Sequence, residues 1–316
     1  MRRVMHDRFG GPEVLELREV DEPHAGPGEV RVRVEAAALN PVDWKIFTGG
    51  SAAVARGLQP PLGVGSDIAG TIDEVGDGVD GWAVGDRVLG SARTRALQDR
   101  TVVDPTRERL ARIPDGLDPA VAASLVVAGR TAWDAVERLV ERAGDTLFVH
   151  GAAGGVGQLA VQLAERKGAR VIGSASERNH ELLRRLGAEP VRYGDGLAER
   201  LLGMLPIDAC LDCADGSGVA AAAEAGVPID RCISIAAKGA HGATGVATDL
   251  ERTGALDELV ALAAAGDLIV PIEARYPLEQ FAAAYRRLMD GHVAGKLVLD
   301  LTAAGDGTTA EREERR

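Results

Sequence analysis

The sequence predicts an α/β protein in which a doubly wound parallel sheet is inserted into a smaller β domain. Between residues 119 and 267, short apolar runs alternate with segments of helical periodicity, which is typical of a parallel sheet covered on both faces. Residues 1–118 instead contain short strands separated by glycine and proline turns, and the chain resumes that character after residue 268. We therefore assign residues 1–118 and 268–316 to the β domain, and 119–267 to the inserted domain with the parallel sheet.

A glycine-rich turn in the middle of the chain is the strongest functional signal. A short strand at residues 146–150 is followed by glycines at 151, 154 and 157 and then by an apolar-periodic helix. Glycine lets the backbone approach a pyrophosphate, and the first N–H groups of the helix point at the anion. A second strand at residues 169–173 favours a nucleotide site over a tight connection without a ligand. The predicted site comprises Gly151, Ala152, Ala153, Gly154, Gly155, Val156 and Gly157.

The N-terminal region begins with predicted strands at residues 14–20 and 29–37. An apolar segment follows, and Asn40-Pro41 favours a turn within it. Short strands then alternate with glycine or Asp-Gly turns up to residue 90. The next segment is basic, and we interpret it as a solvated loop, with a rim that attracts an acidic substrate as the alternative. Its arginines are Arg93, Arg95 and Arg100.

The inserted domain begins at Asp118-Pro119, which is a helix start signal. Strands and helices then alternate as far as a helix near residues 255–265. The tail adds an amphipathic helix at residues 278–290 and a strand at 295–301, and residues 303–316 are polar, charged and predicted to be disordered. Ligands of such folds bind beside the carboxyl ends of the parallel strands, so we expect the active site where the two domains meet.

The composition indicates a globular protein and argues against several partners. The chain has 316 residues, of which 36 are basic and 48 acidic, and its net charge of -12 repels nucleic acid and anionic membranes. No apolar run reaches the ~18 residues that a membrane helix needs, and we expect a cytoplasmic protein with no membrane partner. Three cysteines (Cys210, Cys213 and Cys232) are expected to be buried free thiols, and the six histidines are scattered, so no metal site is predicted.

Six motifs agree in order and spacing with one family. They are ALNPVDWKIFTGG at 38–50, GSDIAGTIDEVG at 65–76, GWAVGDRV at 81–88, AGRTAWDAV at 128–136, HGAAGGVGQLAVQLA at 150–164 and GHVAGKLVLDL at 291–301. The chain thus resembles the zinc-free quinone oxidoreductase (zeta-crystallin-like) branch of the medium-chain dehydrogenase/reductase superfamily. The resemblance implies a GroES-like β domain with an inserted Rossmann domain, and NADPH-dependent reduction of the C=C bond of an enone or quinone. It also implies a homodimer formed through the edge of the Rossmann sheet.

The expected reaction follows from the positions at which zinc-dependent relatives hold their metal. Those relatives carry a cysteine where this chain has residues 40–43, and a Gly-His-Glu motif where it has Gly65-Ser66-Asp67. Alcohol dehydrogenation needs a Lewis acid, so conjugate reduction fits better. In that reaction hydride goes to the β carbon, and the negative charge is delocalised onto the carbonyl oxygen, where hydrogen-bond donors stabilise it.

The end of the second strand of the inserted domain indicates which dinucleotide binds. An acidic residue there would bind the ribose of NAD and repel a 2′-phosphate, whereas this chain has Ser174, Ser176 and Arg178. Hydroxyl groups and a guanidinium favour the phosphate of NADPH. The resemblance also places Tyr193 beside that phosphate. NADPH is therefore the predicted cofactor, and NADH is the alternative.

The resemblance further implies the residues around the reacting atoms. Asn40 and Thr131 match residues near the nicotinamide, although an Asx-Pro turn and a helix-start hydroxyl are alternative interpretations. Lys45 is a candidate donor to the substrate carbonyl or, alternatively, a surface lysine. Lys296 matches the family's Gly-Lys on the cofactor side.

The sequence departs from the family pattern where aromatic residues are expected beside the substrate. Gln98-Asp99-Arg100 stands where Ala-Glu-Tyr is usual, and the Gly49-Gly50-Ser51 segment lacks the usual tyrosine. A flat quinone would lose stacking partners as a result. Two alternative functions therefore stay open, namely a redox-silent cyclase, isomerase or lyase on the same fold and an NADPH-binding protein without turnover.

Overall fold

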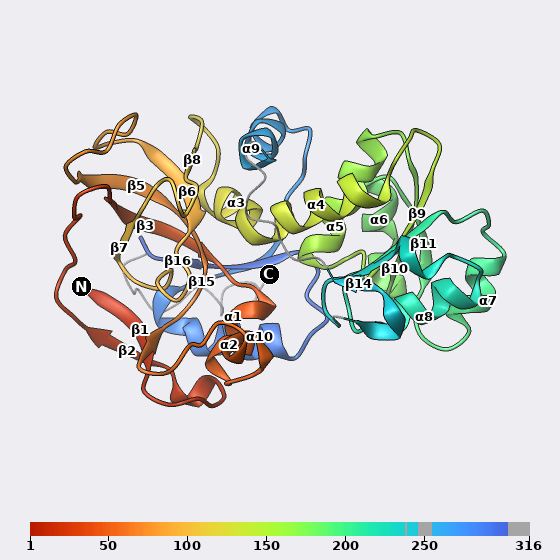
Figure 1. Cartoon of the computed structure of the whole chain (residues 1–316), viewed down its shortest axis with the longest axis horizontal. Coiled ribbons are helices and arrows are strands. Elements are labelled where there is room, and N and C mark those ends of the chain that lie inside the picture. Colours follow the sequence, from red (N-terminus) through yellow and green to blue (C-terminus); the bar gives the residue numbers. More distant parts are fainter. Residues whose placement is uncertain (238, 246–254, 303–316) are drawn as a thin grey trace, which may run out of the picture. The chain divides into compact units, whose positions relative to one another are not determined.

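A computed structural model describes residues 1–237, 239–245 and 255–302 of the chain (Figure 1). The chain divides into two compact units. Unit 1 comprises Met1–Leu110, Ala274–Asp290 and the chain from Leu297 onward, and unit 2 comprises Ala111–Glu273 and Gly291–Lys296. The sequence predicts the domain boundaries between residues 118 and 119 and between residues 267 and 268. The tail predicted to be disordered, at 303–316, lies outside the described residues.

Unit 1 is organised around β-sheets. Strand β1 lies between β2 and β4 in a three-stranded sheet, and the larger sheet has the order β15-β16-β3-β5-β6-β8, with β7 also paired to β3. The strands of these two sheets are β1 (Arg2–His6), β2 (Glu16–Glu19), β3 (Val30–Ala38), β4 (Leu62–Gly63), β5 (Asp67–Val75), β6 (Arg87–Ser91), β7 (Arg100–Val103), β8 (Ala111–Arg112), whose residues belong to unit 2, β15 (Ile272–Pro277) and β16 (Lys296–Asp300). The helices are α1 (Pro41–Phe47), α2 (Ser51–Val54) and α10 (Phe281–Met289).

Strand β3 shows why the N-terminal and C-terminal parts of the chain form one sheet. Its valines at 30, 32 and 34 are buried and alternate with more exposed arginines, so one face of the strand packs into the core. The antiparallel pairing of Val298 with Ala38 places β16 beside this strand. The tail of the chain therefore completes the sheet that the N-terminal residues begin.

The Asn40-Pro41 pair begins a helix rather than interrupting the chain with a turn. Pro41 is the first residue of α1, where a missing N–H costs nothing. The Asp43 carboxylate accepts a hydrogen bond from the Asn40 backbone N–H at 2.9 Å, as in a capping box. Proline therefore fixes the start of this helix.

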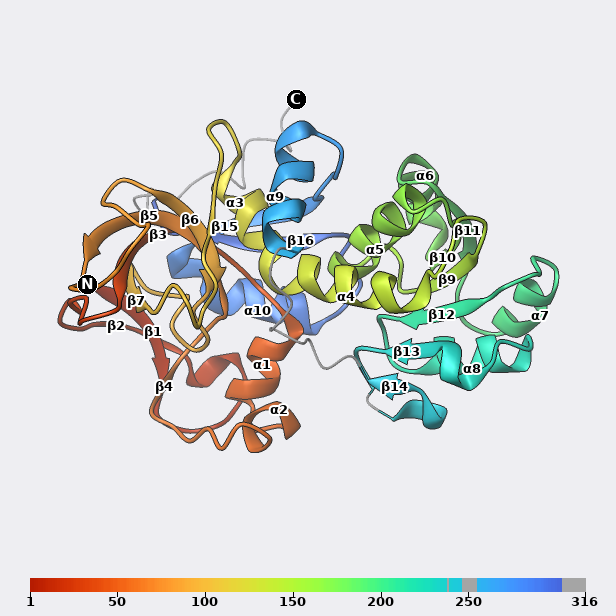
Figure 2. The ribbon, with the colours of Figure 1, turned by 45° about the horizontal axis from the view of Figure 1, so that its top comes forward.

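Unit 2 contains a six-stranded sheet with the order β11-β10-β9-β12-β13-β14, in which every pair is parallel. Helices α4 and α5 pack together on one face, and α7 and α8 lie on the other (Figure 2). The strands are β9 (Thr146–His150), β10 (Arg170–Ala175), β11 (Ala188–Arg192), β12 (Ala209–Asp212), β13 (Cys232–Ser234) and β14 (Thr244–Gly245). The helices are α3 (Pro119–Ser124), α4 (Arg130–Leu139), α5 (Gly155–Arg166), α6 (His180–Arg185), α7 (Leu197–Leu202), α8 (Ser217–Glu224) and α9 (Ala255–Ala265).

The order of these strands confirms the predicted doubly wound α/β fold. From the central strand β9 the chain passes through α5 to β10 and then to β11 at one edge, and it later crosses back to β12 and β13 on the other side of β9. The reversal lies between β9 and β12. Ligands of such sheets bind at the carboxyl ends of the strands beside this reversal, which is where β9 runs into the glycine turn.

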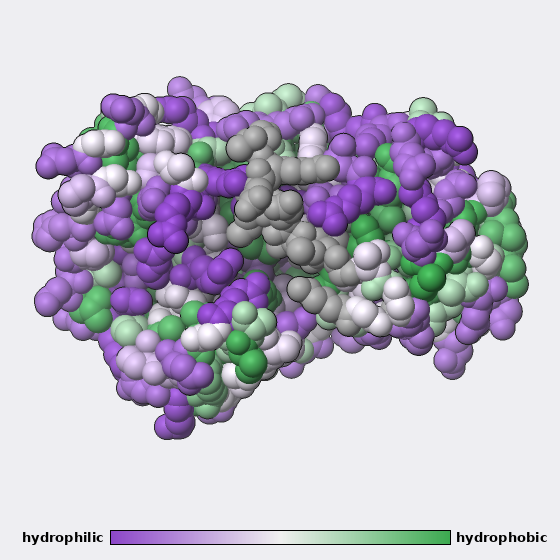
Figure 3. Space-filling model, in the orientation of Figure 1, coloured by the Kyte–Doolittle hydropathy of each residue, from purple (hydrophilic) through white to green (hydrophobic). Residues whose placement is uncertain are grey.

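Small apolar residues fill the core of unit 2, with Phe148 and Ile172 completely buried among them. The surface face drawn in Figure 3 is largely hydrophilic, and apolar residues appear on it in small groups. Among the described residues, none of the helices has the length and apolar character needed to span a bilayer.

We expect Phe148→Ala to lower the free energy of unfolding by about 3–5 kcal/mol, because truncation of a buried aromatic side chain leaves a cavity. Leu202→Ala is the matched control, since Leu202 is 50% exposed and its loss should change stability by less than about 0.5 kcal/mol. Urea titration followed by circular dichroism measures both. Equal losses in the two variants would contradict this placement of the core.

Candidate functional site

The three glycines of the turn between β9 and α5 differ in how strictly the backbone requires them. Gly151 has φ +71°, a backbone conformation that favours glycine. A Cβ on Gly157 would lie 2.4 Å from the Gly151 carbonyl oxygen, so only glycine permits this close packing. A Cβ on Gly154 would meet only that oxygen, at 3.4 Å. The turn therefore leaves no room for a side chain at Gly157, its closed side, but has room for one at Gly154, its open side.

The first turn of α5 has the features of an anion site. Gly154 is the N-cap residue, and no side chain caps the helix. The backbone N–H groups of the first helical residues, Gly155, Val156 and Gly157, have no partner within an ideal helix, and the helix dipole favours an anion beside them. Since the N-cap face is open, these residues fit the pyrophosphate of a dinucleotide.

Residues 291–296 hold the turn from the C-terminal side. The Gly295 N–H donates to the Ala153 carbonyl oxygen at 3.0 Å, and Gly295 forms a parallel bridge with Gly154. A Cβ on Gly155 would lie 2.8 Å from Cδ of Lys296, so the lysine stem runs over the start of α5. Lys296 is 5% exposed. It therefore lies against the glycine turn, and its role on the cofactor side stays a prediction.

Ser174, at the end of β10, lies behind the turn rather than on its surface. It is completely buried. Its hydroxyl oxygen accepts a hydrogen bond from the Gly151 N–H at 3.3 Å and lies 2.7 Å from Nδ1 of His150. Ser174 consequently supports the conformation of Gly151, and a ligand outside the turn would have to approach other residues.

The residues that follow β10 and β11 provide that outer surface. Ser176 is half-buried and Arg178 is exposed. The Arg178 guanidinium donates to the His292 carbonyl oxygen at 3.3 Å. Tyr193 is 40% exposed and directly follows Arg192, which pairs with Ala175 in the sheet. The structure thus brings Ser176, Arg178 and Tyr193 to one edge of the sheet and adds Arg192, which sequence reasoning missed.

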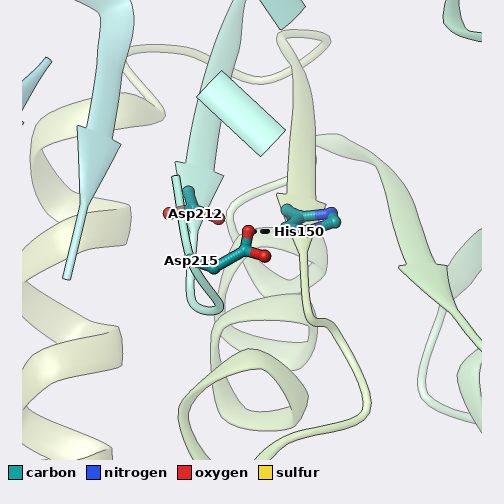
Figure 4. A group of neighbouring side chains, drawn as sticks. All are labelled: His150, Asp212 and Asp215. Carbon is teal, nitrogen blue, oxygen red and sulfur yellow. Dashed lines mark ion pairs between the residues drawn. The ribbon is translucent and has the colours of Figure 1, made fainter. Parts of the chain in front are cut away.

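His150, Asp212 and Asp215 converge at the same edge of the sheet (Figure 4), and one atom from each lies within 4.8 Å of the others. Such a group has the composition of a metal site. Its hydrogen bonds point to a different role. The Ser217 hydroxyl donates to Asp215 at 2.6 Å, so its single proton is not available to His150 Nε2, which lies 3.2 Å away. A hydrogen bond between the two groups therefore requires the tautomer in which Nε2 carries the ring proton and donates to Ser217.

Asp212 is also committed to the protein. It accepts hydrogen bonds from the Gly216 N–H at 2.8 Å and the Ser234 hydroxyl at 2.7 Å. Burial lowers the pKa of His150, and the nearby charges of Asp212 and Asp215 oppose this effect. A neutral, Nε2-protonated imidazole cannot donate a lone pair from Nε2 to a cation. We therefore interpret the group as a hydrogen-bonded support for β9, β12 and α8.

In unit 1, the amide of Asn40 is bound inside the protein. Its Nδ2 donates to Asp67 at 2.8 Å and to the Ala38 carbonyl oxygen at 3.3 Å, so both amide hydrogens are used. Asn40 is 2% exposed. The neighbouring Ser66 hydroxyl donates to Asp43 at 2.7 Å. These contacts orient α1 against β5, and they leave Asn40 no N–H for a substrate.

The two remaining predicted residues lie in different units. Lys45 is half-buried on α1, and its ammonium lies 5.8 Å from the ring centre of Trp44. Thr131 is in unit 2, where α4 follows a π-helical turn at Leu125–Gly129. Its hydroxyl donates to the Val127 carbonyl oxygen at 2.7 Å, so its oxygen retains lone pairs that can accept. Such π-turns are frequent at functional sites.

Comparison with known proteins identifies the family. The model of the alcohol dehydrogenase GroES-like domain matches residues 26–112, and that of the zinc-binding dehydrogenases matches 186–299. A quinone oxidoreductase of Pseudomonas aeruginosa is 32% identical, with 94% of this chain and 99% of the relative covered. The chain belongs to the zinc-free quinone oxidoreductase branch of the medium-chain dehydrogenase/reductase superfamily.

Two further comparisons agree with this family assignment. The structure of the quinone oxidoreductase from Coxiella burnetii is 31% identical with a TM-score of 0.85, over 95% of this chain and 99% of that one. A mycocerosic acid synthase-like polyketide synthase of Mycobacterium tuberculosis is 31% identical over 94% of this chain, which spans 15% of that relative's length. The chain therefore has the family's GroES-like domain and its NAD(P)-binding Rossmann-type sheet, and it is an oxidoreductase of the quinone oxidoreductase type.

The zinc-dependent members of this superfamily hold their metal at positions that are not metal ligands here. Asn40 offers an amide nitrogen whose hydrogens are bound, and the Ser66 hydroxyl donates to Asp43. Zinc prefers thiolate, imidazole and carboxylate ligands. Residues 40–43 and 65–67 contain no cysteine or histidine, and their carboxylates, Asp43 and Asp67, accept hydrogen bonds from Asn40 and Ser66, so this donor set does not fit a catalytic zinc ion. The name of the matched zinc-binding model describes the wider family and not these residues.

We expect Gly157→Ala to lower the free energy of unfolding by about 1–3 kcal/mol, because the new methyl group would overlap the Gly151 carbonyl oxygen. Gly154→Ala is the control within the same turn, and we expect it to cost less than about 1 kcal/mol, since its nearest neighbour lies at an ordinary contact distance. Thermal unfolding without ligand compares the two. If Gly154→Ala were the more destabilising variant, the assignment of open and closed sides would be wrong.

Proposed function

We propose that this protein is an NADPH-dependent reductase of C=C bonds that are conjugated to a carbonyl, as in an enone or a quinone. The observation that carries the proposal is the open, uncapped glycine turn beside a basic, hydroxyl-bearing sheet edge. In an NAD site, an acidic side chain at that edge would bind the ribose hydroxyls. The acidic residue at this edge, Glu177, instead forms an ion pair with Arg192 at 3.7 Å. The residues that flank it favour a 2′-phosphate.

Each part of the proposed cofactor site has a distinct role. The N–H groups of Gly155, Val156 and Gly157 bind the pyrophosphate, while Ala152, Ala153 and Gly154 shape the turn and let it approach. Ser176, Arg178 and Tyr193, together with Arg192, bind the 2′-phosphate. Ser174 contributes indirectly, through the Gly151 N–H. When bound, NADPH supplies the hydride.

The substrate side depends on residues that orient a carbonyl and stabilise its developing charge. The Lys45 ammonium stabilises the negative charge that forms on the carbonyl oxygen, and water returns the proton. The Thr131 oxygen accepts a hydrogen bond from the nicotinamide amide, and Lys296 keeps the glycine turn in position. Asn40 acts by fixing the start of α1, since its amide hydrogens are bound to Asp67 and Ala38.

An unsaturated acyl thioester is a second candidate substrate class. The mycocerosic acid synthase-like polyketide synthase contains a segment similar to nearly all of this chain. A thioester carbonyl polarises its C=C bond as a ketone does, so the same hydride addition would serve. The protein is further proposed to act as a homodimer through an edge of the parallel sheet, with no nucleic acid or membrane partner.

We expect the protein to oxidise NADPH when it is mixed with simple enones, quinones or but-2-enoyl thioesters, as measured by the loss of nicotinamide absorbance. Gly154→Ala should reduce kcat/KM by about tenfold or more, because its methyl group would occupy the open side where the pyrophosphate approaches. No NADPH oxidation with any of these acceptors would contradict the proposal. Turnover without net NADPH loss would favour an isomerase or lyase, and binding alone would favour a protein without turnover.

We expect Arg178→Ala and Arg192→Ala each to raise the KM for NADPH by about tenfold, since each removes a charge-assisted contact worth about 1.5 kcal/mol. The KM for NADH should change by less than about twofold, because NADH has no 2′-phosphate. Arg185→Ala, at the exposed end of α6, is the matched control and should leave both values unchanged. Equal changes for NADPH and NADH would show that these arginines do not recognise the phosphate.

A further inference from the structure

The first glycine of the turn between β9 and α5 is held by a hydrogen bond on each side of its backbone. The Gly151 N–H donates to the hydroxyl oxygen of Ser174 at 3.3 Å. The Gly151 carbonyl oxygen accepts from the N–H of Gly154, the N-cap residue of α5, at 3.0 Å. A displacement of the Gly151 N–H would therefore also move the carbonyl group against which α5 begins. The position of Gly151 is thus coupled to that of the anion site.

The Ser174 hydroxyl has one proton to give, and its contacts decide where that proton goes. Among the described residues, the hydroxyl contacts the Gly151 N–H, which can only donate, and Nδ1 of His150, at 2.7 Å. Ser174 is completely buried, so its proton needs an acceptor inside the protein. Nδ1 is the available acceptor, and it accepts only when it carries no proton.

The contact at the other ring nitrogen of His150 requires the same tautomer. The Ser217 hydroxyl gives its proton to Asp215 at 2.6 Å, and its oxygen lies 3.2 Å from Nε2. A hydrogen bond at this distance uses a proton on Nε2. Burial lowers the pKa of His150, which favours a ring with a single proton at neutral pH. The contacts on both sides of the ring therefore agree, and the hydrogen bonds run in one direction from Gly151 to Asp215.

The packing around His150 fixes the orientation of its ring. A Cβ on Gly218, in the first turn of α8, would lie 2.3 Å from Cβ of His150, so a glycine there makes room for the histidine. The ring centre of Phe148 lies 6.1 Å from that of His150. His150 is 5% exposed. Because the ring is already ordered by these neighbours, holding Nδ1 on Ser174 adds little cost in side-chain entropy.

We propose that His150 is a positioning residue of the cofactor site, which fixes the Ser174 hydroxyl through Nδ1 and thereby holds the N–H of Gly151. Its effect on a bound dinucleotide passes through the protein, because Ser174 and Gly151 stand between the ring and the start of α5. A turn that is held in its binding conformation needs less reorganisation when a ligand arrives. The inference rests on the proposed NADPH-dependent function and adds a residue that acts on cofactor affinity rather than on the chemical step.

Hydrogen exchange of the ligand-free protein, followed by NMR, tests the positioning directly. We expect Ser174→Ala to speed exchange of the Gly151 amide by about tenfold and His150→Gln by at least about threefold, because each weakens the hold on this N–H. A glutamine reaches the Nε2 position but leaves the Nδ1 position without an acceptor. An asparagine places its amide oxygen near the Nδ1 position, so His150→Asn should restore the original exchange rate. The Ala152 N–H is the internal control and should not change, since it binds the backbone carbonyl oxygen of Ser174 at 3.0 Å.

The dissociation constant of NADPH, measured by the fluorescence of the bound nicotinamide, connects this position to binding. We expect Ser174→Ala and His150→Gln each to raise the constant by about fivefold to tenfold, and His150→Asn to keep it within about twofold of the original. The double variant should bind no more weakly than Ser174→Ala alone, because His150 acts through Ser174. In turnover with saturating NADPH, kcat should stay within about twofold in all variants.

The outcomes separate this inference from the proposed function. Equal acceleration of the Gly151 and Ala152 amides, or equal losses of binding in His150→Asn and His150→Gln, would show a general loosening and overturn the positioning role. Additive losses in the double variant would also overturn it, since His150 would then act independently of Ser174. The reductase function stands in each of these cases, because the unaltered protein still binds and oxidises NADPH. If the unaltered protein does not bind NADPH, the proposed function fails, and hydrogen exchange alone decides whether His150 positions Gly151.

Discussion

The close backbone packing of the glycine turn is the constraint on which the cofactor site depends. The Gly151 carbonyl oxygen leaves no room for a side chain on Gly157, and the Gly295 N–H ties the Ala153 carbonyl oxygen from the other side. Gly295 has φ +108°, so that residue too favours glycine. The turn is thus held in one conformation before any ligand arrives, and its N–H groups need little reorganisation to bind an anion.

A buried polar network stabilises this turn from behind. Ser174 contacts Gly151 and His150, and Asp212 binds Ser234 and the start of α8. Each of these side chains stands at the carboxyl end of its own parallel strand. Since the hydrogen bonds join neighbouring strands, they fix the relative positions of the strand ends. The network also gives a histidine and a carboxylate in the interior hydrogen-bond partners within the protein, as buried polar groups need.

The sequence was sufficient to predict the fold class and the turn, because both depend on local patterns. Alternating apolar runs and three spaced glycines are readable without tertiary information. The orientation of a side chain at a strand end is not, and Ser174 illustrates this limit. Its hydroxyl suits a phosphate by chemistry, but the residue is completely buried. Arg192 was missed for the complementary reason, because its proximity to the end of β10 arises only from pairing between strands.

Asn40 stabilises a buried carboxylate in the segment where zinc-dependent relatives carry a cysteine. Asp67 is completely buried, and a buried carboxylate needs a cation or hydrogen-bond donors. The Asn40 amide supplies a donor at 2.8 Å, while Ser66 supplies one to Asp43. A cysteine at position 40 could not make the first of these bonds as strongly, because a thiol is a weak donor. The asparagine therefore follows from the physical requirements of the neighbouring aspartate.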